Sequence, residues 1–437
     1  MRSETALEAR VLCRAIAGLR LLEHLKIEVH FQNLKSLILP LSKNVDPSVH
    51  RQILQHCPVI TTLNPPLIDA NKDALVNLVL TLREHCPEVR NIKLQEWSFY
   101  SKSLFKFLQR LESPLESIYV FQSRIDWSYS ERPAFIATIT RHSTTLTDFR
   151  LSDFPLENLG RKTIAMVLHQ CLALQRFQIV DLHGAAGDLG IEDLVAEEWA
   201  CNGLKHLEMR VDWGEFKNRV PYHLRKIDKP LQDAPDLVET EEDLERWALL
   251  ERFYRQIGTL NQLEVLSLKA TYHGANDHYY PPPFYEYDDW RSPDRAWFPQ
   301  MFTLGDNKPN RRAYLTWFSN LHNLRELRRS IHLISPAIKM TLGPAEYRGM
   351  ATHWPHLKVI ELIEQQLKKP NVERGDAGLS WLLKNLPGID VRHVVSGSGA
   401  NRDEDGVRMR ALWNRRKGRD NLDHEVGFEM RMSMMLC

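Results

Sequence analysis

Seven polar or charged residues recur at one position of a repeated apolar phrase, and their shared spacing could serve a common chemistry. Each directly follows the second apolar residue of its phrase, and the seven are Lys93, Tyr119, Arg150, Gln178, Glu208, Arg328 and Glu361. The chemistry that they offer is molecular recognition, because Tyr and Arg are typical anchors of protein interfaces. Mixed charge with interleaved aromatics suits a protein or peptide ligand better than a nucleic-acid backbone.

Flanking positions of the same phrases extend this candidate surface. They are Asn91, Phe121, Asp148, Arg176 and Arg210. Any exposed sheet carries polar residues. The pattern therefore predicts where a ligand would bind, and it does not identify the ligand.

Catalytic signatures are absent from the sequence. It contains no phosphate-binding glycine loop, no dinucleotide fingerprint, no His-Glu-x-x-His helix and no Gly-x-Ser-x-Gly elbow. Cys57, Cys86, Cys171 and Cys201 each precede the first apolar residue of a phrase by three positions. Equivalent positions of stacked repeats are spread along the stack, so we interpret these thiols as buried packing residues rather than metal ligands. We predict a non-enzymatic protein without cofactor or metal.

The phrase itself predicts the elements that must position these residues. Apolar residues at its first, fourth and sixth positions begin at residues 89, 115, 146, 174 and 204, at intervals of 26, 31, 28 and 30. The alternation within each phrase is that of a short strand. Stretches with helical spacing lie between the phrases, at Asn71–His85, Ser101–Leu111, Glu131–His142 and Arg161–Gln170. Strands joined by helices at a fixed period predict an α/β solenoid with a parallel sheet inside and helices outside.

Two long intervals interrupt the period, each about two repeats long and holding a degenerate repeat or an insertion. We place insertions near residues 212–258 and 271–312 of a solenoid spanning 1–400, followed by a charged tail over 401–437. The first interval contains an acidic run that leads into a helix over Asp243–Ile257. This run is either a solvated loop or a contact for a basic partner. That helix has Leu244, Trp247, Leu250 and Phe253 at helical spacing.

Bulk composition limits the partners. With 57 basic and 56 acidic residues the net charge is +1, which gives no reason to expect nucleic acid as the main partner. No apolar run reaches the roughly 20 residues that a membrane-spanning helix needs. We therefore expect no membrane association and a cytoplasmic or nuclear location.

The phrase resembles the leucine-rich repeat of the ribonuclease-inhibitor-like type. The Cys57-Pro58 and Cys86-Pro87 openings are similar to repeats of fungal F-box/leucine-rich-repeat proteins. That resemblance covers roughly residues 20–395 and implies a scaffold that presents substrates to a cullin-type ubiquitin ligase. The chain departs from the family because it shows no F-box and no asparagine after most strands.

Leucine-rich-repeat horseshoes can also regulate small GTPases, and this role is the alternative. It needs an exposed arginine or asparagine near an early strand end. Asn91 and Arg124 are the candidates that the sequence offers.

Two segments outside the repeats remain open to two interpretations. Pro282, Pro283 and Tyr285 fit the Pro-Pro-x-Tyr ligand of WW domains, but the aromatic residues around them could instead simply hold the loop against the solenoid. The tail carries a basic cluster after Arg408, which is a nuclear-import or phosphate contact or a solvated helix face.

Overall fold

The computed structural model describes sixteen stretches of the chain, and all structural statements below concern these residues. They are 34–38, 47–64, 72–95, 104–121, 132–152, 160–180, 189–213, 240–271, 301–302, 304, 313–333, 344–365, 381–382, 384–386, 388–396 and 407–408. The chain divides into two compact units. The first contains residues 1–218, 239–264 and 268–285, and the second contains 219–238, 265–267 and 286–437.

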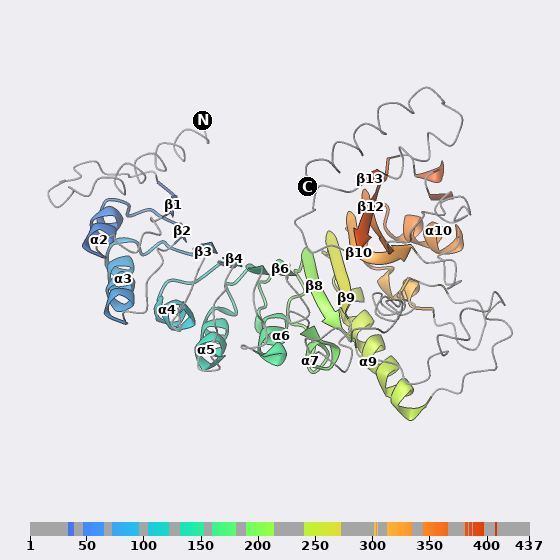
Figure 1. Ribbon diagram of the computed structural model, residues 1–437, viewed down its shortest axis with the longest axis horizontal. Helices are drawn as coiled ribbons and strands as arrows, with labels where there is room; N and C mark the ends of the chain where they lie inside the picture. Colours follow the sequence, from blue (N-terminus) through green and yellow to red (C-terminus); the bar gives the residue numbers. More distant parts are fainter. Residues whose placement is uncertain are drawn as a thin grey trace, which may run out of the picture. The chain divides into compact units, whose positions relative to one another are not determined.

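The first unit alternates strands with helices. Its strands are β1 (Ser36–Ile38), β2 (Thr62–Asn64), β3 (Asn91–Gln95), β4 (Ser117–Phe121), β5 (Asp148–Ser152), β6 (Arg176–Val180), β7 (Leu189–Gly190) and β8 (His206–Asp212). Its helices are α2 (Pro47–Gln55), α3 (Lys72–His85), α4 (Leu104–Arg110), α5 (Arg132–His142), α6 (Arg161–Gln170), α7 (Ile191–Leu194) and α9 (Glu241–Gly258). Strands β1 to β6 and β8 pair side by side and parallel, and β7 pairs with β8. Figure 1 shows strands β1 to β6 and β8 in one row, with helices α2 to α7 on one face of the row.

The second unit continues the same pattern of strands and helices. It begins with the first three residues of β9 (Val265–Thr271), and its further elements are the 3₁₀ helix η8 (Leu315–Phe318), β10 (Glu326–Leu333), α10 (Pro344–His353), β11 (Val359–Gln365), β12 (Asp390–Ser396) and β13 (Val407–Arg408). Strands β9 to β12 pair parallel in chain order, and β13 pairs antiparallel with β12.

The apolar positions of the phrase form the core of the first unit. Phe149 and Phe177 are fully buried on neighbouring strands, with their rings stacked 6.0 Å apart. Phe135 of α5 meets Phe149 edge-on at 6.1 Å and Phe105 of α4 at 4.7 Å. The helices therefore bury their apolar faces against the sheet and each other, as the sequence periodicity requires.

The cysteines explain how each helix turns into the next strand. The Cys86 amide donates to the Leu82 carbonyl at 2.8 Å, and the Cys86 carbonyl accepts the amide of Val89 at 3.3 Å. Its thiol donates to the Leu54 and Cys57 carbonyls of the preceding repeat, at 3.3 and 3.4 Å. The spacing of three residues between cysteine and first apolar position is therefore the span of this turn.

The predicted α/β solenoid of leucine-rich-repeat type is confirmed by this architecture of parallel strands and crossover helices. In the described part of the chain, no helix combines the length and apolar character that membrane crossing demands.

Candidate functional site

Strand pairing brings five of the seven predicted residues into one line across the first unit. Register partners run from Lys93 on β3 through Tyr119, Arg150 and Gln178 to Glu208 on β8. We call these five residues the polar row. Successive side chains of a strand point to opposite faces, so the polar row lies opposite the buried apolar positions.

A second row runs parallel to the first, two residues earlier on each strand. Register partners here are Asn91, Ser117, Asp148, Arg176 and His206. The two rows share one side of the sheet, and together we call them the polar face. Of the other flanking candidates, Arg210 follows Glu208 by two residues on β8, and the side chain of Phe121 is outside the described part.

Arg150 is held at the centre of the polar face by two neighbours. Its Nε donates to Asp148 Oδ1 at 2.8 Å, and its Nη2 pairs with Asp148 Oδ2. Its guanidinium lies over the Tyr119 ring, 5.6 Å from the ring centroid. Hydrogen bonding to Asp148 raises the pKa of Arg150. Burial raises the pKa of the Tyr119 hydroxyl, and the Arg150 charge offsets part of that rise.

Glu208 is the most enclosed carboxylate of the polar face. Its side chain is 11% exposed, and its Oε2 accepts a hydrogen bond from Gln178 Nε2 at 3.0 Å. His206 Nε2 lies 3.4 Å from the same oxygen. These contacts orient the carboxylate, and they fill part of its hydrogen-bonding capacity with side chains of the same face.

The two remaining predicted residues, Arg328 and Glu361, lie on neighbouring strands of the second unit. Arg328 Nε donates to Glu326 Oε2 at 2.7 Å on its own strand, and it lies 3.9 Å from Glu361 Oε1. On β12, Arg392 Nε donates to Asp390 Oδ2 at 3.0 Å, and its Nη1 lies 3.9 Å from the same Glu361 oxygen. The carboxylate of Glu361, 12% exposed, therefore lies between two guanidinium groups.

Sequence reasoning missed Asp390 and Arg392 because the apolar phrase is slipped there. A signal was nevertheless present, since an acidic residue precedes arginine by two positions on four strands. One is β8, with Glu208 and Arg210, and on the other three the acid accepts a hydrogen bond from the arginine. The pairs are Asp148 with Arg150, Glu326 with Arg328, and Asp390 with Arg392. Residues two apart in a strand point to the same face, so such a pair can join its charges within one strand.

Several sequence candidates fall elsewhere. Pro282, Pro283, Tyr285 and Arg124 lie outside the described residues, as does the tail apart from β13. Asn91, the other candidate for a GTPase contact, is half-buried, and its side-chain amide donates to the Thr61 carbonyl at 3.4 Å.

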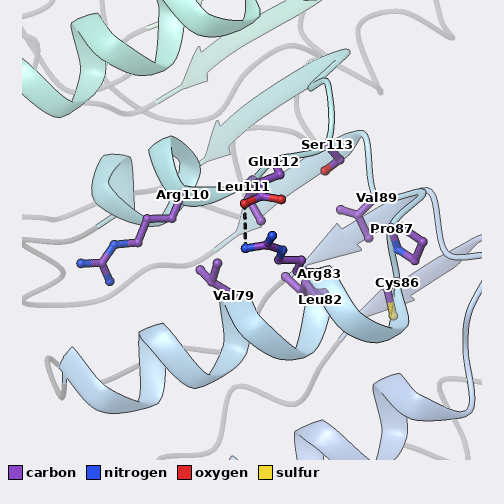
Figure 2. A pocket seen from close by; sticks show the side chains of 10 residues that line it. All are labelled: Val79, Leu82, Arg83, Cys86, Pro87, Val89, Arg110, Leu111, Glu112 and Ser113. Atoms are coloured by element: carbon purple, nitrogen blue, oxygen red, sulfur yellow. Dashed lines mark ion pairs between the residues drawn. The ribbon is translucent and has the colours of Figure 1, made fainter.

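A pocket of about 260 Å³ opens between the C-terminal ends of α3 and α4 (Figure 2). Its lining residues are Val79, Leu82, Arg83, Cys86, Pro87, Val89, Arg110, Leu111, Glu112 and Ser113. Figure 2 shows Arg83 and Glu112 facing each other, and their ion pair measures 2.8 Å. Arg110 extends away from the other labelled side chains (Figure 2).

The pocket offers little reactivity. Burial, and then the neighbouring Cys57, raise the pKa of the Cys86 thiol to about 12, so it stays protonated and is a weak nucleophile. Cys171 and Cys201 are likewise raised to about 12 by burial. The described stretches contain no cluster of His, Cys, Asp or Glu that could hold a metal ion.

No model of a protein family matches the chain, and no curated protein matches it. Among solved structures, it is similar to the leucine-rich-repeat-containing protein LegL7 from Legionella pneumophila, with a TM-score of 0.35 and 10% identity, covering 83% of this chain and 91% of that one. It is also similar to the complex of Rad7 and Elc1 in yeast, with a TM-score of 0.33 and 12% identity, covering 88% of this chain and 86% of that one. The assignment to a leucine-rich-repeat architecture therefore rests on the chain's own strand register and helix–strand alternation.

Proposed function

We propose that the protein is a non-enzymatic interaction scaffold, acting in the cytosol or nucleus, whose polar face binds a protein or peptide. The observation that carries the proposal is the alignment of Lys93, Tyr119, Arg150, Gln178 and Glu208 across parallel strands. A rigid sheet that presents aromatic, amide and charged groups in fixed register suits recognition of an extended surface.

The contacts within the polar face favour recognition over acid–base chemistry. The Asp148 carboxylate is occupied by Arg150, and the Glu208 carboxylate accepts from Gln178. The pKa of Tyr119 is raised, which disfavours the phenolate that a nucleophile or base would need. Arg150 is already ordered by Asp148 and Tyr119, so a ligand that contacts it loses little additional side-chain freedom on binding.

Affinity capture with a matched pair of variants tests this proposal. The double variant Tyr119→Ala and Arg150→Ala removes the centre of the polar face. The control carries Gln109→Ala and Lys162→Ala, two exposed helix positions. Tagged proteins would be expressed in the cells that encode them, cross-linked and analysed by mass spectrometry.

We expect wild type and control to capture the same partners and the double variant to lose them. Circular dichroism and urea unfolding must show that the double variant is folded, because Arg150→Ala leaves Asp148 without its cation. Equal capture by all three folded proteins would refute binding through the polar face.

A finer proposal concerns the assembly in which the scaffold acts. The Cys-Pro repeats resemble those of F-box/leucine-rich-repeat proteins, and this supports a role as substrate-recognition module of a cullin-type ubiquitin ligase. Co-purification of the full chain with the ligase's adaptor and cullin subunits tests that role. Partner capture without these subunits would remove the ubiquitin role and leave the interaction scaffold in place.

A further inference from the structure

We infer that the polar face binds an extended acidic peptide segment, anchored at its two ends by Lys93 and Arg176. The inference rests on the proposed function, because it names the chemistry of the partner for that same surface. Four observations carry it. The carboxylates of the face are poorly exposed, two of its cations form no ion pair in the described part of the chain, Tyr119 and Arg150 lie between these cations, and the distance between the cations fits an extended peptide.

The carboxylates of the polar face are poorly exposed and already accept hydrogen bonds from neighbouring side chains. The side chains of Asp148 and Glu208 are 21% and 11% exposed, so they are the less accessible charges. Asp148 accepts from Arg150, and Glu208 accepts from Gln178. A basic ligand would have to displace these internal hydrogen bonds, which disfavours a cationic partner.

Two cations of the polar face differ from Arg150, which pairs with Asp148 on its own strand. Lys93 is exposed on β3 and Arg176 is half-buried on β6. Within the described stretches, neither forms an ion pair. Their charges are therefore open to an anionic ligand, and an acidic side chain meeting either one need not break an existing pair.

The centre between these two cations is suited to an apolar or aromatic side chain. There the guanidinium of Arg150 lies over the ring of Tyr119, and both side chains are partly exposed. Aromatic rings and stacked guanidinium groups provide contact area with little loss of side-chain freedom. The ligand is therefore expected to place an apolar residue between its acids.

The spacing of the cations sets the spacing of the acids. Lys93 and Arg176 lie three strands apart and in neighbouring rows. Strands about 4.8 Å apart and rows about 6.6 Å apart place the two positions roughly 16 Å from each other. An extended peptide advances about 3.3 Å per residue, and only residues an even number of positions apart point to the same face. Acids four positions apart therefore span about 13 Å on one face, and the long side chains of Lys93 and Arg176 cover the remaining few ångströms.

Fluorescence polarisation with synthetic peptides tests the inference. The probe is a labelled peptide of about 14 residues, with two Glu about four positions apart and a Phe midway, so that all three side chains share one face of the extended peptide. One comparison peptide has the same composition with the two Glu adjacent, and another has Lys in place of both Glu. A labelled oligothymidylate provides the nucleic-acid alternative, and all probes are measured with the full-length protein.

We expect the spaced acidic peptide to bind about tenfold more tightly than the adjacent-Glu and Lys peptides, and to weaken as salt rises. The variant Lys93→Glu with Arg176→Glu should lose about tenfold in affinity for it and gain affinity for the Lys peptide. The control Arg110→Glu with Lys162→Glu makes the same charge change at exposed helix positions and should leave binding unchanged.

Three results would overturn the inference. They are equal affinity for the spaced and adjacent peptides, an equal loss of binding in the control variant, and tighter binding of oligothymidylate than of any peptide. The proposed function fails separately, when the Tyr119 and Arg150 double variant captures every wild-type partner. If that variant loses its partners while the acidic peptides do not bind, the polar face is a binding surface for a partner of other chemistry.

Discussion

His142 shows at the scale of one residue how burial in this fold changes an ionisable group. It ends α5 in the core of the first unit, and its Nδ1 accepts the backbone N–H of Leu115 at 3.2 Å. Burial, together with the nearby charge of Arg141, lowers the pKa of His142 from 6.5 to about 4. The ring is therefore neutral in the folded protein at neutral pH, as the hydrogen bond from Leu115 requires.

The lowered pKa predicts a loss of stability in mild acid. Between pH 6.5 and about 4 the unfolded chain binds a proton at His142 that the folded chain does not. The free energy of unfolding should therefore fall as pH falls through this window, by at most about 3 kcal/mol. Urea unfolding of wild type and His142→Gln across this range measures the effect, and the variant should show the weaker dependence.

The exposed His356 supplies a matched control for the titration of His142. His356→Gln should keep the wild-type dependence on pH, since this substitution leaves the buried ring of His142 in place. Parallel curves for wild type and His142→Gln would show that another group causes the acid sensitivity.

At the scale of an element, helix α9 shows how one face of a helix is fixed to the preceding repeat. Arg252 Nη2 donates to the Val195 carbonyl, and Gln256 Nε2 donates to the Glu197 carbonyl at 2.8 Å, so the helix is anchored to the segment after α7. Beneath these contacts the ring of Phe253 meets Trp199 edge-on at 6.1 Å. Both rings are buried, so the aromatic contact and the backbone acceptors together hold α9 in place.

Two substitutions on α9 should have very different costs. Phe253→Ala removes a fully buried ring and should lower the free energy of unfolding by about 3–5 kcal/mol. Leu244→Ala, on the same helix but 49% exposed, should lower it by less than about 1 kcal/mol. Urea unfolding compares the two variants, and similar losses would mean that the packing of α9 is not what stabilises this region.

The elements of the first unit were predictable because their signal is local periodicity. The helices expected over Arg161–Gln170 and Glu131–His142 are α6 and α5, with ends that agree within one residue. The helix expected over Asp243–Ile257 is α9, at Glu241–Gly258, where Trp247, Leu250 and Phe253 are buried as the spacing indicated. Leu244 is the exception, since it is 49% exposed. Helical spacing shows which residues share a face of the helix, but it does not show how far along the helix that face is covered.

The polar row was predictable for the same reason, since a constant position in parallel repeats becomes a line across the sheet. Its contacts were not predictable. Whether Arg150 turns to Asp148 or outward depends on the competition between neighbouring side chains, which the repeat period does not encode. The Arg392–Asp390 pair was missed because the apolar phrase that would have located it is slipped by one residue.

At the scale of the whole molecule, each strand depends chiefly on its two neighbours. In the first unit β4 pairs with β3 and with β5, and these pairings recur strand by strand. A solenoid of this kind has stability that is approximately a sum of repeat and nearest-neighbour terms. Damage to one repeat should therefore spread to the adjacent repeats before it reaches distant ones.

Hydrogen exchange of an Ile118→Ala variant tests this locality. Ile118 is fully buried on β4, and its truncation should cost about 2–5 kcal/mol. We expect faster amide exchange in β3, β4 and β5, and wild-type exchange in β11 and β12 of the second unit. Ile118→Val should produce the same pattern more weakly, whereas uniform acceleration over all strands would show that the chain unfolds as one cooperative body.

The acid–arginine pairs within single strands have a consequence for how such a chain can change. Each strand that carries one, as β5 does with Asp148 and Arg150, brings its own counter-charge and needs none from a neighbour. The same holds for β10 with Glu326 and Arg328, and for β12 with Asp390 and Arg392. If such a repeat is duplicated or exchanged, its arginine keeps the carboxylate of its own strand. Deletion differs, because Glu361 on β11 lies near Arg328 and Arg392 and would lose one of these cations with the repeat of β10 or β12. Gene rearrangement could thus alter the length and ligand preference of the sheet while each paired arginine keeps its counter-charge within its own strand.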